Sequence, residues 1–210
     1  MRLGVRGYAL TELALSALAS GDEIIWHPRE PALLADGWCI VHFSVPETER
    51  RKRHQLRAHL RAIGFGNIGT ALWIAPARMR SAGERAISEL GLTGCAAVFV
   101  GEHIAGQRLQ DLLYQSWDLD DIDRGYRDFI GRHTGLLEQV GRSGSTDPRQ
   151  QFISYMQVVD RWRALPFRDP GLPRELLTDD WQGPAAAALF ERLVQALEPG
   201  ALSYASMLWP

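Results

Sequence analysis

Residues 37–76 read GWCIVHFSVPETERRKRHQLRAHLRAIGFGNIGTALWIAP, and this stretch decides the fold. Its first apolar run, residues 38–45, is rich in β-branched and aromatic side chains and predicts a buried strand. In the Arg-rich part that follows, Leu56, Leu60 and Ile63 recur at the spacing of one helix face. Glycines then end the helix, and residues 67–75 predict a strand, a tight turn and another strand.

Outward from this stretch, residues 78–90 predict a second helix and residues 95–100 a last strand. The element order is β-α-β-β-α-β, the ferredoxin-like arrangement, in which the first and last strands are antiparallel neighbours. Cys39 and Cys95 begin those two strands and so lie at opposite ends of the pair, too far apart for a disulfide. We therefore expect a ferredoxin-like central domain over residues 37–104 with two free thiols.

The flanking regions differ in kind. Residues 1–26 predict one strand and one helix, which cannot form a core by themselves. Residues 105–210 follow a largely helical pattern, with a helix start at Asp147-Pro148 and a final helix over residues 185–196 that Pro199-Gly200 closes. The expected class is α+β, with a mainly helical C-terminal domain.

Composition limits the function classes. A hydrophobic fraction of 46% fits a globular protein, and a net charge of −2 does not mark the whole chain as a nucleic-acid binder. No apolar run reaches the roughly 18 residues of a membrane span. A glutamate interrupts the apolar N-terminal stretch, so we expect no signal peptide and a cytoplasmic protein.

Motifs of enzymes and metal sites are missing from the sequence. It contains no P-loop, GxSxG, HExxH or CxxC motif, so we expect no catalytic residues, no cofactor and no metal. The aspartates at positions 118, 120, 121 and 123 permit a cation site. A negatively charged helix start, which satisfies free N–H groups, is the favoured interpretation.

The first predicted helix of the central domain is strongly basic. It carries six positive charges in twelve residues. One interpretation is a solvated face paired with nearby glutamates, and the other is a surface that contacts phosphates. The charges belong to Arg50, Arg51, Lys52, Arg53, Arg57 and Arg61.

A second group of arginines lies beside aromatic residues. Arg161, Arg163 and Arg168 surround Trp162 and Phe167. Such arginines can hold the phosphates of a nucleotide-containing ligand while apolar walls hold its organic part. Packing of Trp162 on a helix explains the aromatic residues equally well.

Several short motifs in the chain are characteristic in combination. They are Gly64-Phe65-Gly66, Leu72-Trp73-Ile74-Ala75-Pro76, Arg168-Asp169-Pro170, Leu172-Pro173, Glu175-Leu176-Leu177, Trp181, Gly183 and Pro199-Gly200-Ala201-Leu202. With these motifs the chain resembles the PaaX family, bacterial transcriptional repressors of phenylacetate degradation. The central segment resembles the family's middle domain, and the segment from Arg168 onward resembles its C-terminal domain.

The resemblance implies a winged helix-turn-helix, a ferredoxin-like central domain and a helical effector-binding domain over residues 105–210. It implies a homodimer that binds operator DNA and releases it when an aryl-acyl-CoA binds, typically phenylacetyl-CoA. The expected ligand residues are Arg161, Trp162, Arg163, Arg168 and Trp181. The expected DNA contacts are Arg2, Arg6, Arg50, Arg53, Arg57 and Arg61.

Residues 2–20 resemble only the last wing strand and the helix after it, so operator recognition is expected to need a DNA-reading part that this chain lacks. A truncated start and a sensor without a reader both remain open. An alternative is a module that only dimerises. Another is a metal-dependent nuclease, because the central domain also resembles a small CRISPR-associated nuclease. That family has an aspartate where the first strand ends, whereas this chain has no carboxylate there before Glu47.

Overall fold

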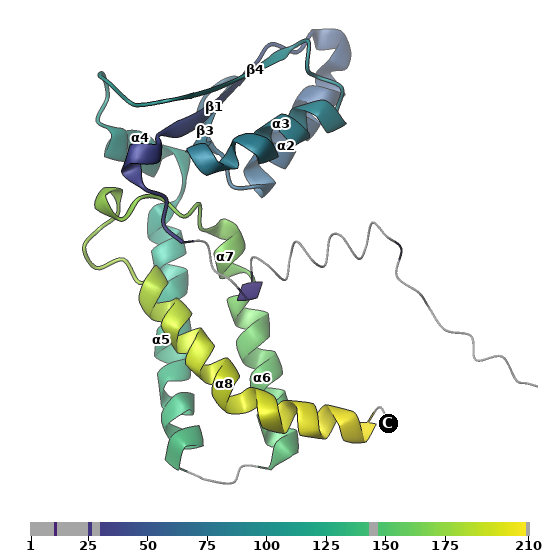
Figure 1. The fold of residues 1–210 in the computed structure, drawn as a ribbon, viewed down its shortest axis with the longest axis vertical. Helices are drawn as coiled ribbons and strands as arrows, with labels where there is room; N and C mark the ends of the chain where they lie inside the picture. The colour runs from purple at the N-terminus through teal and green to yellow at the C-terminus, as the bar shows by residue number, and fades with distance from the viewer. Residues whose placement is uncertain (1–10, 12–24, 27–29, 143–146, 209–210) are drawn as a thin grey trace, which may run out of the picture.

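The fold was obtained as a computed structural model, which describes residues 11, 25–26, 30–142 and 147–208. A compact sheet-and-helix domain lies at one end of an elongated molecule, and long helices form the other end (Figure 1). The expected N-terminal unit, residues 1–26, lies almost wholly outside the described residues. No helix in the described ranges is long and apolar enough to cross a membrane.

The central domain has one four-stranded sheet. Its strands are β1 (Trp38–Phe43), β2 (Gly66–Gly69), β3 (Leu72–Pro76) and β4 (Ala96–Gly101). Their order is β2-β3-β1-β4, and every neighbouring pair is antiparallel. The predicted order of strands and helices is confirmed, as is the pairing of the first strand with the last.

Two helices cover one face of this sheet. They are α2 (Arg50–Ala62) and α3 (Arg80–Glu89), each preceded by a 3₁₀ turn, Glu47–Glu49 and Ala77–Met79. The core beneath them contains Trp73, Leu56, Leu60 and Phe65, all at most 2% exposed. The inward helix face expected from the spacing of Leu56 and Leu60 is therefore confirmed.

The two cysteines behave as predicted. Cys39 lies opposite Val100 on β4, whereas Cys95 precedes the first residue of β4 at the other end of the pair. Both thiols are free, and Cys39 is fully buried. Burial raises the pKa of the Cys39 thiol to about 11, because the thiolate would lose its hydration.

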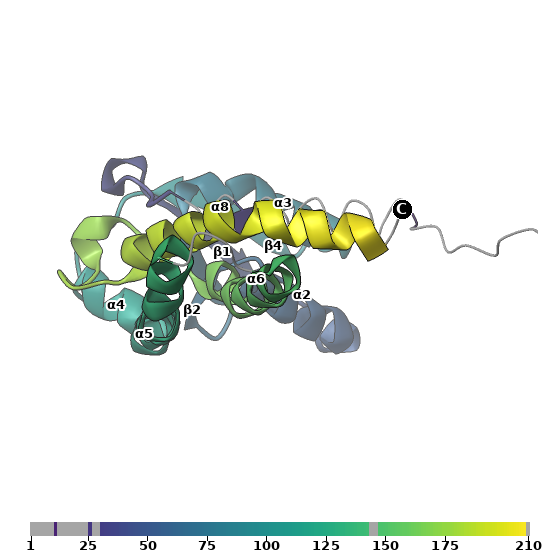
Figure 2. The same ribbon diagram turned by 90° about the horizontal axis from the view of Figure 1, so that it is seen from below.

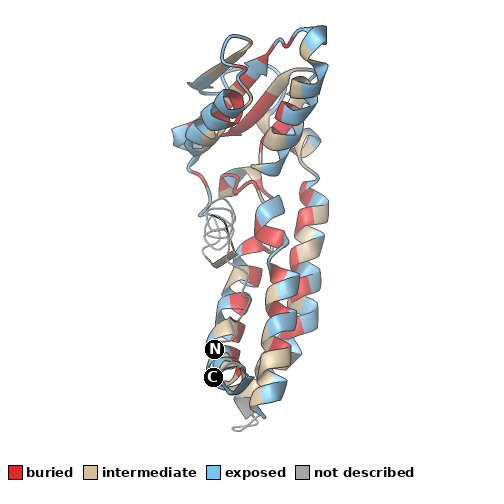
Figure 3. Ribbon diagram, turned by 90° about the vertical axis from the view of Figure 1, so that its right-hand side faces the viewer, coloured by how far each residue is buried: buried red, intermediate tan, exposed pale blue. Residues whose placement is uncertain are grey.

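The C-terminal half consists of helices. They are α4 (Leu109–Ser116), α5 (Leu119–Arg142), α6 (Pro148–Trp162), α7 (Leu165–Arg168) and α8 (Gly183–Leu208), with a 3₁₀ turn at Arg174–Leu176. One more 3₁₀ turn, Leu34–Asp36, precedes β1. Helix α8 packs along both α5 and α6, as Figures 1 and 2 show from two directions. The buried residues form stripes along the facing sides of these helices (Figure 3). As predicted, Asp147 caps α6 by accepting a hydrogen bond from the Arg149 N–H at 3.1 Å.

The expected end of the last helix is wrong. We predicted that Pro199-Gly200 closes it, but α8 continues through both residues to Leu208 and changes direction along its length (Figure 1). Packing against α6 stabilises the continuation, with the rings of Phe152 and Tyr204 5.5 Å apart. Contacts between helices thus outweigh the hydrogen bond that proline removes.

The two halves share part of their cores. The side chains of Trp38 and Ile74, from the sheet face opposite α2 and α3, belong to the buried cluster of the C-terminal helices. Strand β2 also approaches the end of α4 so closely that a Cβ on Gly66 would lie 2.7 Å from Ser116 Cβ. The helical half therefore has a fixed position against the sheet, which allows sites to form between them.

Candidate functional site: an aromatic cavity beneath the interdomain strap

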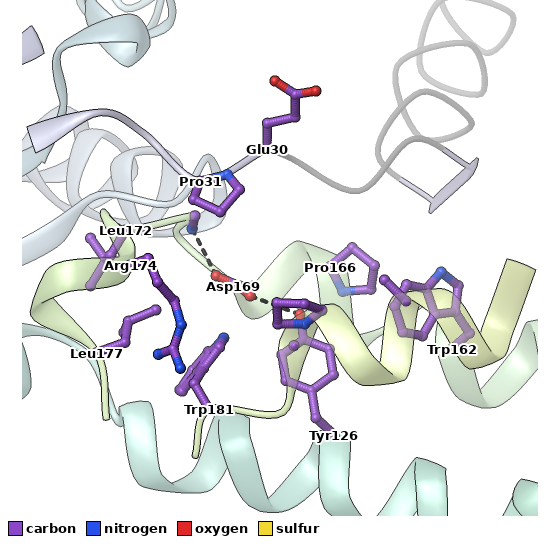
Figure 4. A pocket seen from close by; sticks show the side chains of 14 residues that line it. Glu30, Pro31, Tyr126, Trp162, Pro166, Asp169, Leu172, Arg174, Leu177 and Trp181 are labelled. Carbon is purple, nitrogen blue, oxygen red and sulfur yellow. Dashed lines mark hydrogen bonds between the residues drawn. The ribbon is translucent and has the colours of Figure 1, made fainter. Parts of the chain in front are cut away.

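A cavity of about 220 Å³ opens where residues 30–32 cross the C-terminal half (Figure 4). We call residues 30–32 the strap; it leads from the N-terminal region into the central domain. The cavity wall combines aromatic, aliphatic and a few polar groups. It consists of Glu30, Pro31, Tyr126, Trp162, Pro166, Asp169, Gly171, Leu172, Arg174, Leu177, Trp181, Gly183, Pro184 and Ala187.

Three large aromatic side chains form much of the wall. Tyr126 comes from α5, Trp162 from the end of α6, and Trp181 from the loop before α8. The Tyr126 ring centre lies 6.1 Å from that of Trp162 and 5.9 Å from that of Trp181, the latter edge to face. Trp162 also stacks on Phe190 of α8 at 4.6 Å. These contacts fix the rings in the rigid, apolar surroundings that suit an aromatic ligand.

Two carboxylate residues line this wall, Glu30 and Asp169, and Asp169 is the one that bonds to the aromatic part of it. The Tyr126 hydroxyl donates to its Oδ2 at 2.8 Å, and the Gly171 N–H donates to its Oδ1 at 2.7 Å. Figure 4 shows both bonds as dashed lines. Burial, followed by the nearby Asp169 charge, raises the pKa of the Tyr126 hydroxyl far above its ordinary value. Tyr126 therefore stays neutral and donates, which fixes the position of both side chains.

Hydrogen bonds hold the strap over the cavity. The Ala32 N–H donates to the Gly171 carbonyl at 3.1 Å, and Arg78 donates to the same carbonyl at 2.9 Å and to the Glu30 carbonyl. Partial burial lowers the pKa of Arg78, although the nearby Asp169 charge acts in the opposite direction. Just before the strap, the Ile25 carbonyl accepts a hydrogen bond from Trp162 Nε1 at 2.9 Å. One cavity wall thus connects the C-terminal half, the central domain and the segment toward the N-terminus.

Sequence reasoning located this cavity only in part. Trp162 and Trp181 were expected ligand residues, and both line it. Tyr126, Asp169 and Arg174 line it as well and were not expected. Asp169 lies within the family motif Arg168-Asp169-Pro170, which was the available signal. The position of Tyr126 follows only from the packing of α5 against the loops.

The expected ligand arginines are not among the lining residues of this cavity. Arg168 forms an ion pair with Asp121 of α5, and Arg163 pairs with Asp160 at 2.9 Å. Arg161 is exposed near the end of α6. The one arginine in the cavity wall is Arg174, which donates to the carbonyls of Thr178 and Asp179.

Four of the six arginines expected to contact DNA lie on α2, where they form two groups. Arg50 and Arg53 form ion pairs with Glu47, at 3.8 Å and 2.9 Å. Farther along the helix, Arg57 donates to the Thr70 carbonyl at 2.6 Å. Arg57 and Arg61 lie over the Trp73 ring, 5.7 Å and 5.8 Å from its centre. Arg2 and Arg6 lie outside the described residues.

The carboxylates considered for metal binding have other partners. Asp118 accepts a hydrogen bond from the Asp121 N–H at 3.0 Å, as expected of a residue that starts a helix. Glu47, the first carboxylate after β1, forms its ion pairs with Arg50 and Arg53. In the described ranges no three such ligand residues come together in a way that could hold a metal ion.

Comparisons with known proteins agree with this architecture. Residues 32–113 match the model of the PaaX protein central Cas2-like domain, and residues 117–207 match that of the PaaX-like protein C-terminal domain. The chain is 22% identical to the transcriptional repressor PaaX of Escherichia coli (strain K12) over 208 residues, which is 97% of this chain and 63% of that protein. The chain thus spans less than two thirds of the length of this curated relative.

A solved structure supports the same fold. The uncharacterized protein Rv0674 from Mycobacterium tuberculosis superposes with a TM-score of 0.60 and 21% identity, covering 94% of this chain and 74% of that one. The first match ends within α4 and the second begins just before α5. On the strength of both domain models together, this chain belongs to the PaaX family.

Proposed function

We propose that this chain is the effector-sensing part of a cytoplasmic transcriptional repressor, and that it binds an aryl-acyl-CoA such as phenylacetyl-CoA. The observation that carries the proposal is the aromatic cavity beneath the strap. At about 220 Å³ it is smaller than the roughly 300–1,000 Å³ of sites for drug-sized ligands, so it suits one aromatic ring with a short acyl chain.

The larger, charged part of such a thioester would lie outside the cavity. Arg174 is at the wall, and Arg161, Arg163 and Arg168 remain candidates for phosphate contacts on the surface nearby. Ligand in the cavity would press on Pro31 of the strap and so reach the segment that leads to the N-terminus. This path gives effector binding a physical route to a DNA-reading domain.

We propose the DNA-binding role for the complete regulator, because the Escherichia coli relative is named a transcriptional repressor. Within this chain, Arg2, Arg6, Arg50, Arg53, Arg57 and Arg61 would contribute contacts to phosphates. Such contacts hold a protein on DNA without reading its sequence.

We also propose a ferredoxin-like central domain that joins two copies of the chain. Edge strand β4 offers exposed apolar side chains for this, with Phe99 59% and Val100 50% exposed.

Thermal unfolding with phenylacetyl-CoA tests the sensor role. A ligand that binds only the folded chain must stabilise it, by about 2.7 kcal/mol at one hundred times its dissociation constant. We expect Tm to rise with phenylacetyl-CoA and less with free CoA. Trp181→Leu should remove most of the difference, whereas Met156→Leu, a change at a half-exposed position of α6, should keep it. The sensor role is wrong if millimolar thioester leaves Tm unchanged.

A further inference from the structure

A second concave site lies on the other side of α7. It is a groove of about 530 Å³ between α2 and β2 of the central domain and the junction of α4 with α5. Pro166 of α7 and Asp169, which follows it, line the aromatic cavity, whereas Phe167 and Arg168 line the groove. The short helix thus separates two different sites. The proposed function offers Arg61 to DNA phosphates and Arg168 to effector phosphates, but it gives the groove that joins them no ligand of its own.

The groove holds two arginines from different domains. Arg61 of α2 is exposed and forms no ion pair with any described residue. Its guanidinium group lies over the Trp73 ring. Arg168 pairs with Asp121, but Arg124 binds that same carboxylate at 3.1 Å. Asp118 is the only carboxylate among the lining residues. The groove therefore carries an excess of positive charge with guanidinium groups to spare for an anion.

The wall of the groove contains flat and polar surfaces as well. Phe167 is 41% exposed. Trp117 packs against Gly66, and a Cβ added to Gly66 would lie 2.8 Å from the Trp117 ring. Trp73, which also lines the groove, is fully buried, yet its indole N–H has no acceptor among the described residues. A buried donor without an acceptor destabilises the fold, and an acceptor atom from a ligand would relieve that cost.

We propose that this groove binds a small nucleotide, with phosphate oxygens between Arg61 and Arg168 and the heteroaromatic ring against Phe167. Guanidinium groups bind phosphate, as they bind carboxylate, through two parallel hydrogen bonds, and the heteroaromatic base of a nucleotide stacks on aromatic side chains. The site is recessed between two domains, with Trp73 and Phe65 at most 2% exposed in its wall. A recessed site fits a free nucleotide better than the backbone of a duplex, which needs an open surface.

Calorimetric titration of the full chain with ADP tests the proposal. ADP has no aryl-acyl group that could occupy the aromatic cavity. Because ADP is also the nucleotide part of a CoA thioester, the Trp181→Leu variant is needed to separate the groove from the effector cavity. We expect ADP to bind to the unmodified chain. Arg61→Gln and Arg168→Gln should each weaken the affinity for ADP at least about tenfold, in line with a lost charge-assisted hydrogen bond. Arg51→Gln should leave the affinity for ADP unchanged. Arg51 is the matched control, because it is an exposed arginine of the same helix outside the groove.

Two further arms identify the source of the phosphate and the role of the ring. Phe167→Ala should reduce ADP affinity toward that of pyrophosphate while leaving pyrophosphate binding intact. Trp181→Leu, in the other cavity, should leave ADP binding unchanged. Because Arg168→Gln removes an ion pair, the Tm of each variant is first measured without ligand and compared with that of the unmodified protein. If Arg168→Gln does not fold, the test relies on Arg61→Gln alone.

Three results would overturn the proposal. The first is no ADP binding at millimolar concentration, and the second is equal loss in the Arg51 control. The third is the finding that duplex DNA binds through Arg61 and that ADP does not displace it. This result would mean that the arginines contact the DNA backbone. If ADP fails while phenylacetyl-CoA still raises Tm, only the groove is wrong; the reverse result would reject the effector cavity alone.

Discussion

The protonation state of single residues in this protein depends on the side chains that pack around them. Cys39 is an example, because its position on β1 places the thiol inside the sheet-and-helix core, where it is fully buried. Tyr126 is another, because the packing of α5 buries its ring and leaves the hydroxyl one acceptor, Asp169. In both cases burial keeps an ionisable group neutral and so preserves the packing around it.

The two thiols should therefore react very differently. Burial raises the pKa of Cys39 to about 11, so the reactive thiolate is scarce in the folded protein up to that pH, whereas Cys95 is only half-buried. We expect one fast and one protected thiol when the native protein is titrated with a chromogenic disulfide at pH 8. Cys95→Ser should abolish the fast phase, and denaturant should release the slow one. A fast phase that survives in Cys95→Ser would contradict this burial.

Elements in this protein are joined by close backbone approach as well as by large side chains. Strand β2 lies against the end of α4 at Gly66, which has no side chain to separate them. The contact brings Ser116 and Trp117 against the sheet and so forms one wall of the groove. Replacing hydrogen with a methyl group at this one position should push strand and helix apart.

Gly66→Ala should destabilise the protein by about 1–3 kcal/mol, the usual cost of forcing extra volume into a packed site. The added Cβ would lie 2.7 Å from Ser116 Cβ and 2.8 Å from the Trp117 ring. Chemical denaturation measures the change. Gly94→Ala is the matched control, because a Cβ there meets nothing within 4 Å. Equal stability of the two variants would show that β2 and α4 are not in contact.

At the scale of the whole molecule, Arg78 connects the parts. It follows β3 of the central domain, and it donates to the carbonyls of Glu30 in the strap and Gly171 in the C-terminal half. The cavity wall depends on these bonds, because Glu30 and Gly171 both line it. Removing the guanidinium should loosen the strap without disturbing either core.

Arg78→Ala should lower the free energy of unfolding by about 1–3 kcal/mol, as expected when a charged donor is lost from the exposed Glu30 carbonyl and the part-buried Gly171 carbonyl. Exchange of the amide hydrogens of Glu30, Ala32, Gly171 and Leu172 should accelerate while the sheet stays protected. Arg80→Ala is the control, because Arg80 is exposed and pairs only with Glu84. Unchanged exchange in the strap would mean that Arg78 does not hold it. We also expect weaker effector binding in Arg78→Ala, because the strap forms part of the cavity.

Much of the architecture could be predicted from the pattern of side chains. The spacing of Leu56 and Leu60 predicted the buried face of α2, and the sequence of apolar runs and glycine turns predicted the order of strands and helices along the chain. The site was harder to predict. Its two tryptophans were expected, but Tyr126, Asp169 and Arg174 come from separate segments that only folding brings together.

The sequence by itself determined the class of fold, the pairing of first and last strands, and the membership in a family, because these follow from local periodicity and short motifs. The tertiary structure alone decided that α8 continues through Pro199, because contacts with α6 offset a local penalty that sequence rules count in full. It also decided which arginines are available to a ligand. Arg163 and Arg168 have carboxylate partners, whereas Arg61 has none among the described residues, and that distinction depends on neighbours far away in the chain.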